Sequence, residues 1–266
     1  MTTGSIHVGI GGWTYEPWRG TFYPDGLKHA DELGYAASKL TGIEINGTYY
    51  RTQSRASFEK WRDAVPDAFI FALKASRFCT NRRVLAEAGD SIAKFLGQGV
   101  AVLGGKLGPI LWQFMPTKSF DAEDFGIFLD LLPLEQEGVP LRHAVEVRHD
   151  SFRDPHFIDL ARAHNVAVVF ADSPDYPAIA DLTADFVYAR LQDAQETVAT
   201  GYPADALDRW AGIARQWCSG ESPEGLPYIA ETKADGRPRD VFLFMINGAK
   251  VRAPAAAQAL IARLEN

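Results

Sequence analysis

The chain has 266 residues, of which 47% are hydrophobic and 23% charged, and its formal net charge is −7. This composition is ordinary for a globular protein, and the negative charge argues against non-specific binding of nucleic acid, which needs a basic face. No apolar run reaches the length of about 18 residues that a membrane span needs. With two cysteines and no secretory signal, we expect a cytoplasmic protein without a disulfide framework.

Eight short runs rich in β-branched and aromatic residues recur along the chain, and we predict them as strands. They span residues 6–12, 42–46, 69–76, 108–114, 143–149, 166–172, 186–192 and 241–247. Helical patterns follow most of them, at about residues 30–40, 54–64, 82–96, 121–132, 155–164, 204–218 and 254–264. Asp121 and Asp205 lie where helix starts are expected, and Pro155 and Pro254 suit a first helical turn.

The alternation of strands and helices predicts one α/β domain over residues 1–266, a (β/α)8 barrel of the TIM type. The link at residues 173–185 is short and contains two prolines, so we expect its helix, the sixth, to be short or missing. A doubly wound open sheet is the alternative, but eight such units in one domain fit a closed barrel better.

Polar side chains interrupt these strands at or near their carboxyl ends, which form the mouth of a TIM barrel and carry its active site. The period of two puts Glu44 and Asn46 on one strand face, and likewise Glu146 and Arg148. A structural lattice of ion pairs is the alternative, but buried charges are costly unless paired. We predict a functional site with contributions from Trp13, Glu44, Asn46, Lys74, Gln113, Glu146, Arg148, Asp172, Arg190 and Asn247.

Seven motifs extend this pattern: GGWTYEPWRGTFYPDGL, EINGTYYR, FALKASRFCTN, LWQFMP, EVRHDSF, YARLQ and FLFMINGAKVRAP. They resemble the successive motifs of the YecE-like family, domain of unknown function 72, from about Gly9 to Leu260. The resemblance implies a TIM barrel with a site at its mouth, and it supplies no reaction. The chain departs from the family pattern at Asn81, Gln192, Asp193, Ile246 and Gly248. The resulting loss of two imidazoles and one carboxylate fits either an altered specificity or a lost activity.

The cationic and amide side chains of the predicted mouth favour a small anionic or sugar-like ligand. Arg148 and Arg190 would present planar forks suited to phosphate or carboxylate, and Lys74 would add a point charge. Neutral hydrogen bonds would come from Asn46, Gln113 and Asn247.

Glu44 and Glu146 are the predicted general acid and base, with pKa values separated by different surroundings. The alternative for each is an ion pair, with Lys74 and Arg148 respectively. Lys74 itself could instead form a Schiff base, but that role needs a lowered pKa, and a neighbouring Glu44 would raise it. His149 is either a further acid or base or a cap of the following loop.

We predict no metal or cofactor. If a metal did bind at the mouth, its oxygen ligands would suit magnesium better than zinc. The aromatic residues after the first strand either pack that loop onto the barrel or form a stacking wall. The wall would contain Trp13 and Tyr15 together with Tyr49, Tyr50 and Arg51.

Three functions remain open at this point. The favoured one is an enzyme that uses acid/base chemistry on a small anionic or sugar-like substrate. The second is a nucleic-acid-processing, endonuclease-like barrel, which requires a basic rim. That rim would be Arg51, Arg55, Arg77, Arg82 and Arg83. The third is a non-catalytic protein that binds a ligand.

Overall fold

The computed structural model describes residues 4–230 and 235–265. Its main sheet has nine parallel strand segments in the order β8-β7-β4-β3-β2-β1-β11-β10-β9. They are β1 Ile6–Gly11, β2 Gly42–Ile45, β3 Ile70–Lys74, β4 Leu107–Gln113, β7 His143–Glu146, β8 Ala167–Val168, β9 Phe170–Asp172, β10 Phe186–Leu191 and β11 Asp240–Met245.

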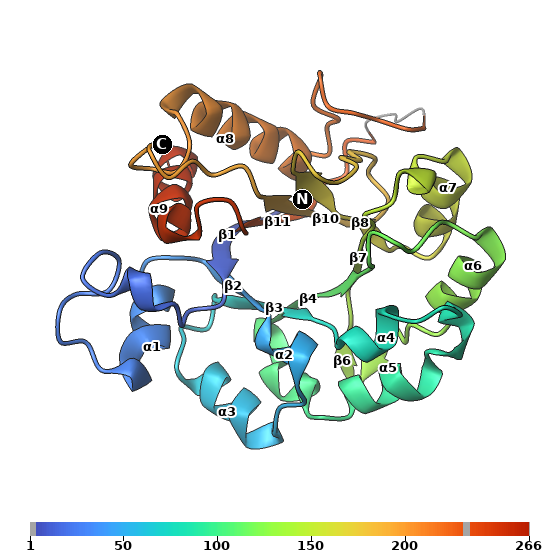
Figure 1. The fold of residues 1–266 in the computed structure, drawn as a ribbon, viewed down its shortest axis with the longest axis horizontal. Coiled ribbons are helices and arrows are strands. Elements are labelled where there is room, and N and C mark those ends of the chain that lie inside the picture. The colour runs from blue at the N-terminus through green and yellow to red at the C-terminus, as the bar shows by residue number, and fades with distance from the viewer. Residues whose placement is uncertain (1–3, 231–234, 266) are drawn as a thin grey trace.

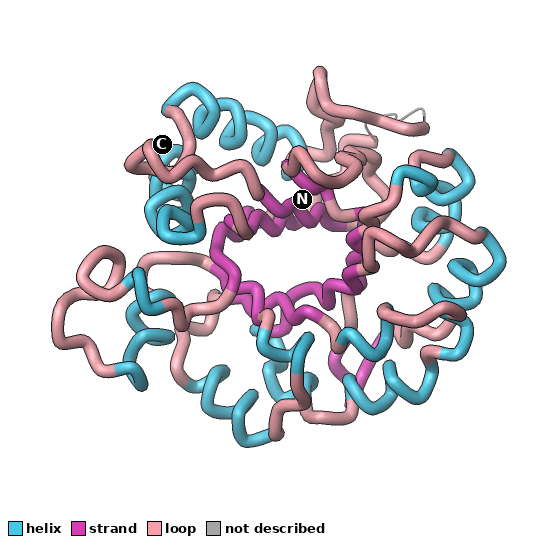
Figure 2. The backbone as a smooth tube through the Cα atoms, viewed as in Figure 1, coloured by secondary structure: helices cyan, strands magenta, loops and turns pink. Residues whose placement is uncertain are grey.

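The sheet closes on itself through its sixth strand. β8 and β9 are two parts of this strand, separated only by Val169; β8 pairs with β7 and β9 pairs with β10. β8 and β9 are the first and last segments in the strand order. Because they belong to one strand, the nine segments form a closed barrel of eight strands. Figure 2 shows the strands as a closed ring inside a ring of helices.

Helices cover the outside of the barrel (Figure 1). The longer ones are α1 Glu32–Ala37, α3 Arg55–Asp63, α5 Gly89–Leu96, α6 Ala122–Asp130, α7 Pro155–Ala163, α8 Ala204–Cys218 and α9 Ala253–Leu264. Residues 173–185, all of them described, contain no helix. The predicted TIM barrel without a full sixth helix is therefore confirmed.

Several local features differ from the sequence prediction. Single-turn helices α2 Gly47–Tyr50 and α4 Arg77–Thr80 follow the second and third strands directly. A hairpin of β5 Glu135–Gln136 and β6 Val139–Pro140 lies outside the barrel sheet. Elements of two to four residues are too short to show a periodic pattern, so the sequence gives no sign of them.

The predicted helix starts are confirmed at all four positions. Asp121 caps α6 by accepting from the Asp124 N–H, and Pro155 and Pro254 lie in the first turns of α7 and α9. Asp205 does not cap α8, which begins after Pro203; it lies in the first turn instead. There a carboxylate still interacts favourably with the helix dipole.

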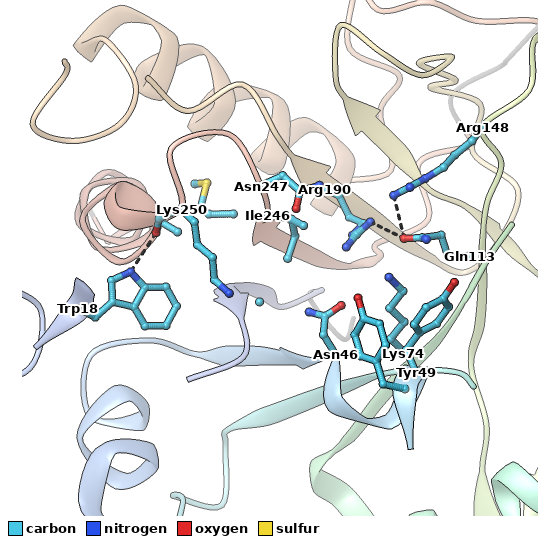
Figure 3. A pocket seen from close by; sticks show the side chains of 14 residues that line it. Trp18, Asn46, Tyr49, Lys74, Gln113, Arg148, Arg190, Ile246, Asn247 and Lys250 are labelled. Atoms are coloured by element: carbon cyan, nitrogen blue, oxygen red, sulfur yellow. Dashed lines mark hydrogen bonds between the residues drawn. The ribbon is translucent and has the colours of Figure 1, made fainter. Parts of the chain in front are cut away.

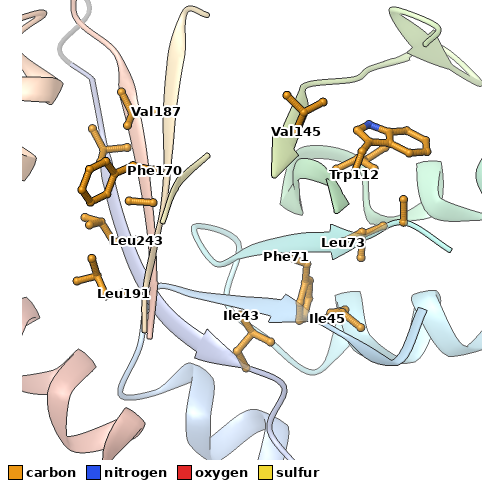
Figure 4. Close-up of a cluster of buried hydrophobic side chains, with 14 of the residues drawn as sticks. Ile43, Ile45, Phe71, Leu73, Trp112, Val145, Phe170, Val187, Leu191 and Leu243 are labelled. Atoms are coloured by element: carbon orange, nitrogen blue, oxygen red, sulfur yellow. The ribbon is translucent and has the colours of Figure 1, made fainter. Parts of the chain in front are cut away.

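The core has two apolar layers separated by the barrel wall. Outward-facing residues of the strands, among them Ile43, Phe71 and Leu243, form the layer between barrel and helices (Figure 4). Alternate residues face inward and fill the lower lumen, including Ile70, Ala72, Leu111, Tyr188, Phe242 and Phe244. None of the helices within residues 4–230 and 235–265 combines the length and apolarity of a membrane span.

Candidate functional site

Above the apolar filling of the lumen lie five buried polar side chains, which we call the polar layer. Each comes from a different strand and lies at or near its carboxyl end. They are Glu44, Lys74, Gln113, Glu146 and Arg190. Alternate side chains of each strand point into the barrel, and those near the carboxyl ends form one layer. Residues far apart in the sequence therefore lie close together.

Arg190 holds two carboxylates at once. Its Nε and Nη2 donate to the two oxygens of Glu44, each at 3.0 Å, and its Nη1 donates to Glu146 Oε2. The Tyr188 hydroxyl adds a 2.7 Å hydrogen bond to Glu44 Oε2. Both carboxylates have 0% exposure, so these contacts satisfy charges that water does not reach.

Arg148 extends this network toward the mouth. It donates to Glu146 Oε1 at 2.7 Å and to Gln113 Oε1 at 2.8 Å. Burial alone would raise the pKa of Glu146, but the Arg190 and Arg148 guanidiniums hold it below its ordinary value. The Tyr176 ring lies 4.2 Å from the Arg148 guanidinium and comes from the helix-free link 173–185. The missing sixth helix thus leaves room for a loop that covers Arg148.

Lys74 has no anionic partner. Within the described ranges, Nζ makes no hydrogen bond and no ion pair, and it lies 4.3 Å from the centroid of the Tyr49 ring. Burial, and then the nearby Arg190 charge, lower the pKa of Lys74 to about 8. Glu44 raises this pKa only through space, because Arg190 and Tyr188 occupy its oxygens. The ion pair considered for Lys74 and Glu44 does not form.

A cavity of about 410 Å³ opens above the polar layer. In Figure 3, Arg148 and Arg190 reach the same Gln113 oxygen, Lys74 rises beside Tyr49, and Lys250 approaches from the opposite side. The described residues that line the cavity include no aspartate or glutamate. They are Gly11, Trp18, Asn46, Tyr49, Tyr50, Lys74, Gln113, Arg148, Arg190, Met245, Ile246, Asn247, Lys250 and Ala253.

Most of the predicted ligand-binding residues gather here. Asn46, Tyr50, Gln113, Arg148, Arg190 and Asn247 line this cavity. Trp13 and Arg51 line an adjoining hollow, and Tyr15 packs edge-on against the buried Trp18. The loop after the first strand therefore packs on itself and against Tyr35 and Trp61 of the neighbouring helices, and it contributes Trp18 to the cavity. Glu44 and Glu146 lie below the floor, so their roles as acid and base stay predictions.

Asp172 and His149 lie outside the cavity lining. Asp172 shares its strand face with Phe170, which packs against Trp210 and Trp217 of α8, so it points away from the lumen. Burial, then the charge of Asp193, raise the pKa of Asp172 to about 6. His149 caps the turn Asp150–Phe152, because its Nδ1 accepts from the Ser151 N–H.

Two residues of the site, Lys250 and Tyr176, are not among those predicted from the sequence. Lys250 follows the last strand within the FLFMINGAKVRAP motif, and only this motif could have indicated it. Tyr176 stands in a link with no periodic pattern. Among the described His, Cys, Asp and Glu residues, no three lie close enough to hold a metal ion.

Comparison with known proteins places the chain in a family. The family model described as "Protein of unknown function DUF72" matches residues 7–266. The chain belongs to the DUF72 family. No curated protein matches it.

Two solved DUF72 structures resemble this chain over nearly their whole length. A DUF72 family protein from Thermotoga maritima MSB8 is 21% identical with a TM-score of 0.75, covering 98% of this chain and 100% of its own. One from Enterococcus faecalis V583 is 16% identical with a TM-score of 0.71, covering 98% and 96%. At these identities the likeness shows the shared barrel fold.

Three of the residues that we expect to depart from the family pattern lie beside residues of the cavity wall. Asn81 donates to the Tyr49 hydroxyl at 3.2 Å, and Gln192 accepts from Asn247 at 3.1 Å. Gly248 has a φ of 55°, and a Cβ there would lie 2.7 Å from the Gln192 carbonyl oxygen. A side chain at this position would therefore push the two loops apart.

We expect Glu44→Gln to destabilise the fold by about 3–5 kcal/mol, because it leaves the buried Arg190 charge without one of its partners. Urea denaturation midpoints measure this loss. The matched control is Glu59→Gln on α3, where a half-exposed carboxylate pairs with Arg55 and should contribute less than about 1 kcal/mol. Unchanged stability with lost ligand binding would instead support Glu44 as a reacting carboxylate.

We expect Lys74→Met to be more stable than the wild type at neutral pH, because the folded protein no longer buries an unpaired ammonium. The pKa of Lys74 is lowered from 10.5 to about 8, so between these values the unfolded chain binds a proton that the folded protein has released. Wild-type stability then rises with pH, and the advantage of Lys74→Met shrinks by about 3 kcal/mol.

Denaturation across this pH range checks this expectation. Lys60→Met on α3 is the control, since it removes an exposed lysine instead of a buried one. A stability difference between wild type and Lys74→Met that stays constant with pH would contradict the lowered pKa.

Proposed function

We propose that the chain is an enzyme that binds a small anionic substrate in the barrel mouth and acts on it by proton transfer. The observation that carries this proposal is the composition of the cavity wall. Lys74, Arg148, Arg190 and Lys250 line it, and the carboxylates that balance part of their charge lie beneath the floor. An oxyanion is the natural counter-charge for such a wall.

The two ends of the cavity would have different tasks. Arg148 and Arg190 are fixed by Glu44, Glu146 and Gln113, so they present donors in a rigid arrangement. Such preorganised charge binds an anion without the entropic cost of ordering flexible side chains. Lys250, exposed at the rim over the Tyr15 ring, would complete the contact from the other side.

Lys74 is the group best suited to move a proton. Its pKa of about 8 lies near physiological pH, where both the ammonium and the amine are populated. The arginines stay charged over the whole accessible range, and Glu146 has its pKa held down. This assignment puts the proton transfer on Lys74 rather than on the two glutamates.

The nucleic-acid alternative receives less support from the rim arginines. Arg55 pairs with Glu59 and Glu137, and Arg82 donates to the Phe78 carbonyl and to Ser91 Oγ. Two carboxylates thus offset the charge of Arg55, which reduces what it offers to a phosphate backbone. Binding to single-stranded DNA that falls steeply with salt would favour this alternative.

We expect sulfate, phosphate and small carboxylates to raise the melting temperature, because a ligand of the folded state adds RT ln(1 + [L]/Kd) to stability. Thermal melts at ionic strength matched with chloride measure the effect. Arg148→Met and Lys250→Met should each weaken the apparent affinity about 10-fold or more, since each removes a charged donor.

Lys60→Met serves as the control, because it removes an exposed lysine on α3, outside the cavity lining. Equal shifts in the wild type and all three variants would show that the anions act elsewhere. The absence of any shift in the wild type would refute the anion site itself.

A further inference from the structure

The most unusual side chain of the cavity is Lys74. It stands at the end of β3 with 7% exposure, and no carboxylate among the described residues pairs with it. The nearest acidic groups, Glu44 and Glu146, are held by Arg190 and Arg148. Its amine is therefore free to react with a molecule that enters the cavity (Figure 3).

The surroundings of Lys74 favour the neutral amine. Burial removes the water that would solvate the ammonium, and the guanidiniums of Arg190 and Arg148 repel a further positive charge. Only a neutral amine has the lone pair that attacks carbon, so a lysine that loses its proton easily is a better nucleophile near neutral pH. A lysine paired with Glu44 would have been held in the charged form, and the structure shows that this pairing is absent.

We propose that Lys74 forms an imine with the carbonyl carbon of a small substrate that also carries a carboxylate or phosphate. This inference rests on the proposed anion site, and it names the substrate class as anionic aldehydes or ketones. The Arg148 side would hold the anionic group, which leaves the carbonyl within the lower part of the cavity beside Lys74 and Tyr49.

The reaction balances without an oxidant or reductant. The Lys74 lone pair forms the C–N bond while the carbonyl π pair moves to oxygen, and a proton passes from nitrogen to that oxygen. A second proton from solvent then lets the oxygen leave as water, which gives the protonated imine. The positive imine withdraws electrons from the neighbouring carbon, and the fixed cations hold the anionic end in place.

The cavity has the size and wall chemistry for such a molecule. Its volume of about 410 Å³ lies at the small end of ligand pockets. Tyr49 and Tyr50 form one wall, and the Asn46 amide and the Gln113 side chain offer neutral polar contacts. A compound with one oxyanion and one carbonyl could use both the cationic side and the free amine.

Glyoxylate is the probe, because it combines an aldehyde with a carboxylate. The protein is incubated with glyoxylate and sodium cyanoborohydride, which reduces the imine to a stable amine, and peptides are mapped by mass spectrometry. Lys74 should be modified at least ~10-fold faster than Lys60 near neutral pH, since more of it is neutral. The rate at Lys74 should reach half its maximum near pH 8.

Sulfate should slow modification of Lys74 and leave Lys60 unchanged, because it competes for the cationic side of the cavity. Propionaldehyde, which lacks the carboxylate, should lose the preference for Lys74. Lys74→Arg should give no adduct at this position. Lys60→Met should keep the Lys74 adduct.

The outcomes separate this inference from the anion site. A sulfate-induced rise in melting temperature without preferred modification of Lys74 overturns the imine and leaves the proposed function standing. Modification of Lys74 and Lys60 at equal rates, unaffected by sulfate, also overturns it, because it reflects ordinary amine chemistry. Failure of both the melting shift and the adduct refutes the proposed function together with the inference.

Discussion

Arg190 is the side chain on which the rest of the barrel mouth depends. It joins strands β2, β7 and β10 by binding Glu44 through two hydrogen bonds and Glu146 through a third. Breaking such a buried arrangement by removing one partner leaves an uncompensated charge, whereas the intact arrangement is close to neutral in stability. Its main contribution is therefore geometric: it fixes the carboxyl ends of three strands and holds both carboxylates beneath the cavity.

The charges of the polar layer explain why an anion should bind. Glu44 and Glu146 offset Arg190 and Arg148, which leaves Lys74 without a counter-ion within the described residues. A small anionic ligand would supply the missing negative charge, and it would bind to a cavity wall already ordered by hydrogen bonds. The same imbalance lowers the pKa of Lys74, so the proposed ligand binding and the proposed proton transfer depend on one feature of the site.

The sequence predicts the fold well and the site only in part, for physical reasons. Strand position follows from local composition, and the period of two correctly puts Glu44 with Asn46, and Glu146 with Arg148, on inward faces. Pairing is a different problem, because Glu44 and Arg190 are 146 positions apart and no local pattern links them. Lys74 shows the consequence: the sequence suggests Glu44 on the neighbouring strand as its partner, but Arg190 and Tyr188 bind that carboxylate instead. The sequence also does not show which face of its strand Asp172 occupies. The run VAVVFAD is apolar almost throughout, and its strand is interrupted at Val169.

The central claim is that the Arg190 arrangement leaves Lys74 as a buried amine without a carboxylate partner. An NMR titration of lysine side chains labelled with ¹³C at Cε, assigned by comparison with Lys74→Arg, reports this state directly. The account predicts one lysine that titrates near pH 8 and disappears in the variant. A Lys74 signal that titrates at or above the ordinary value of 10.5 would mean that a carboxylate holds its charge, and would contradict the account.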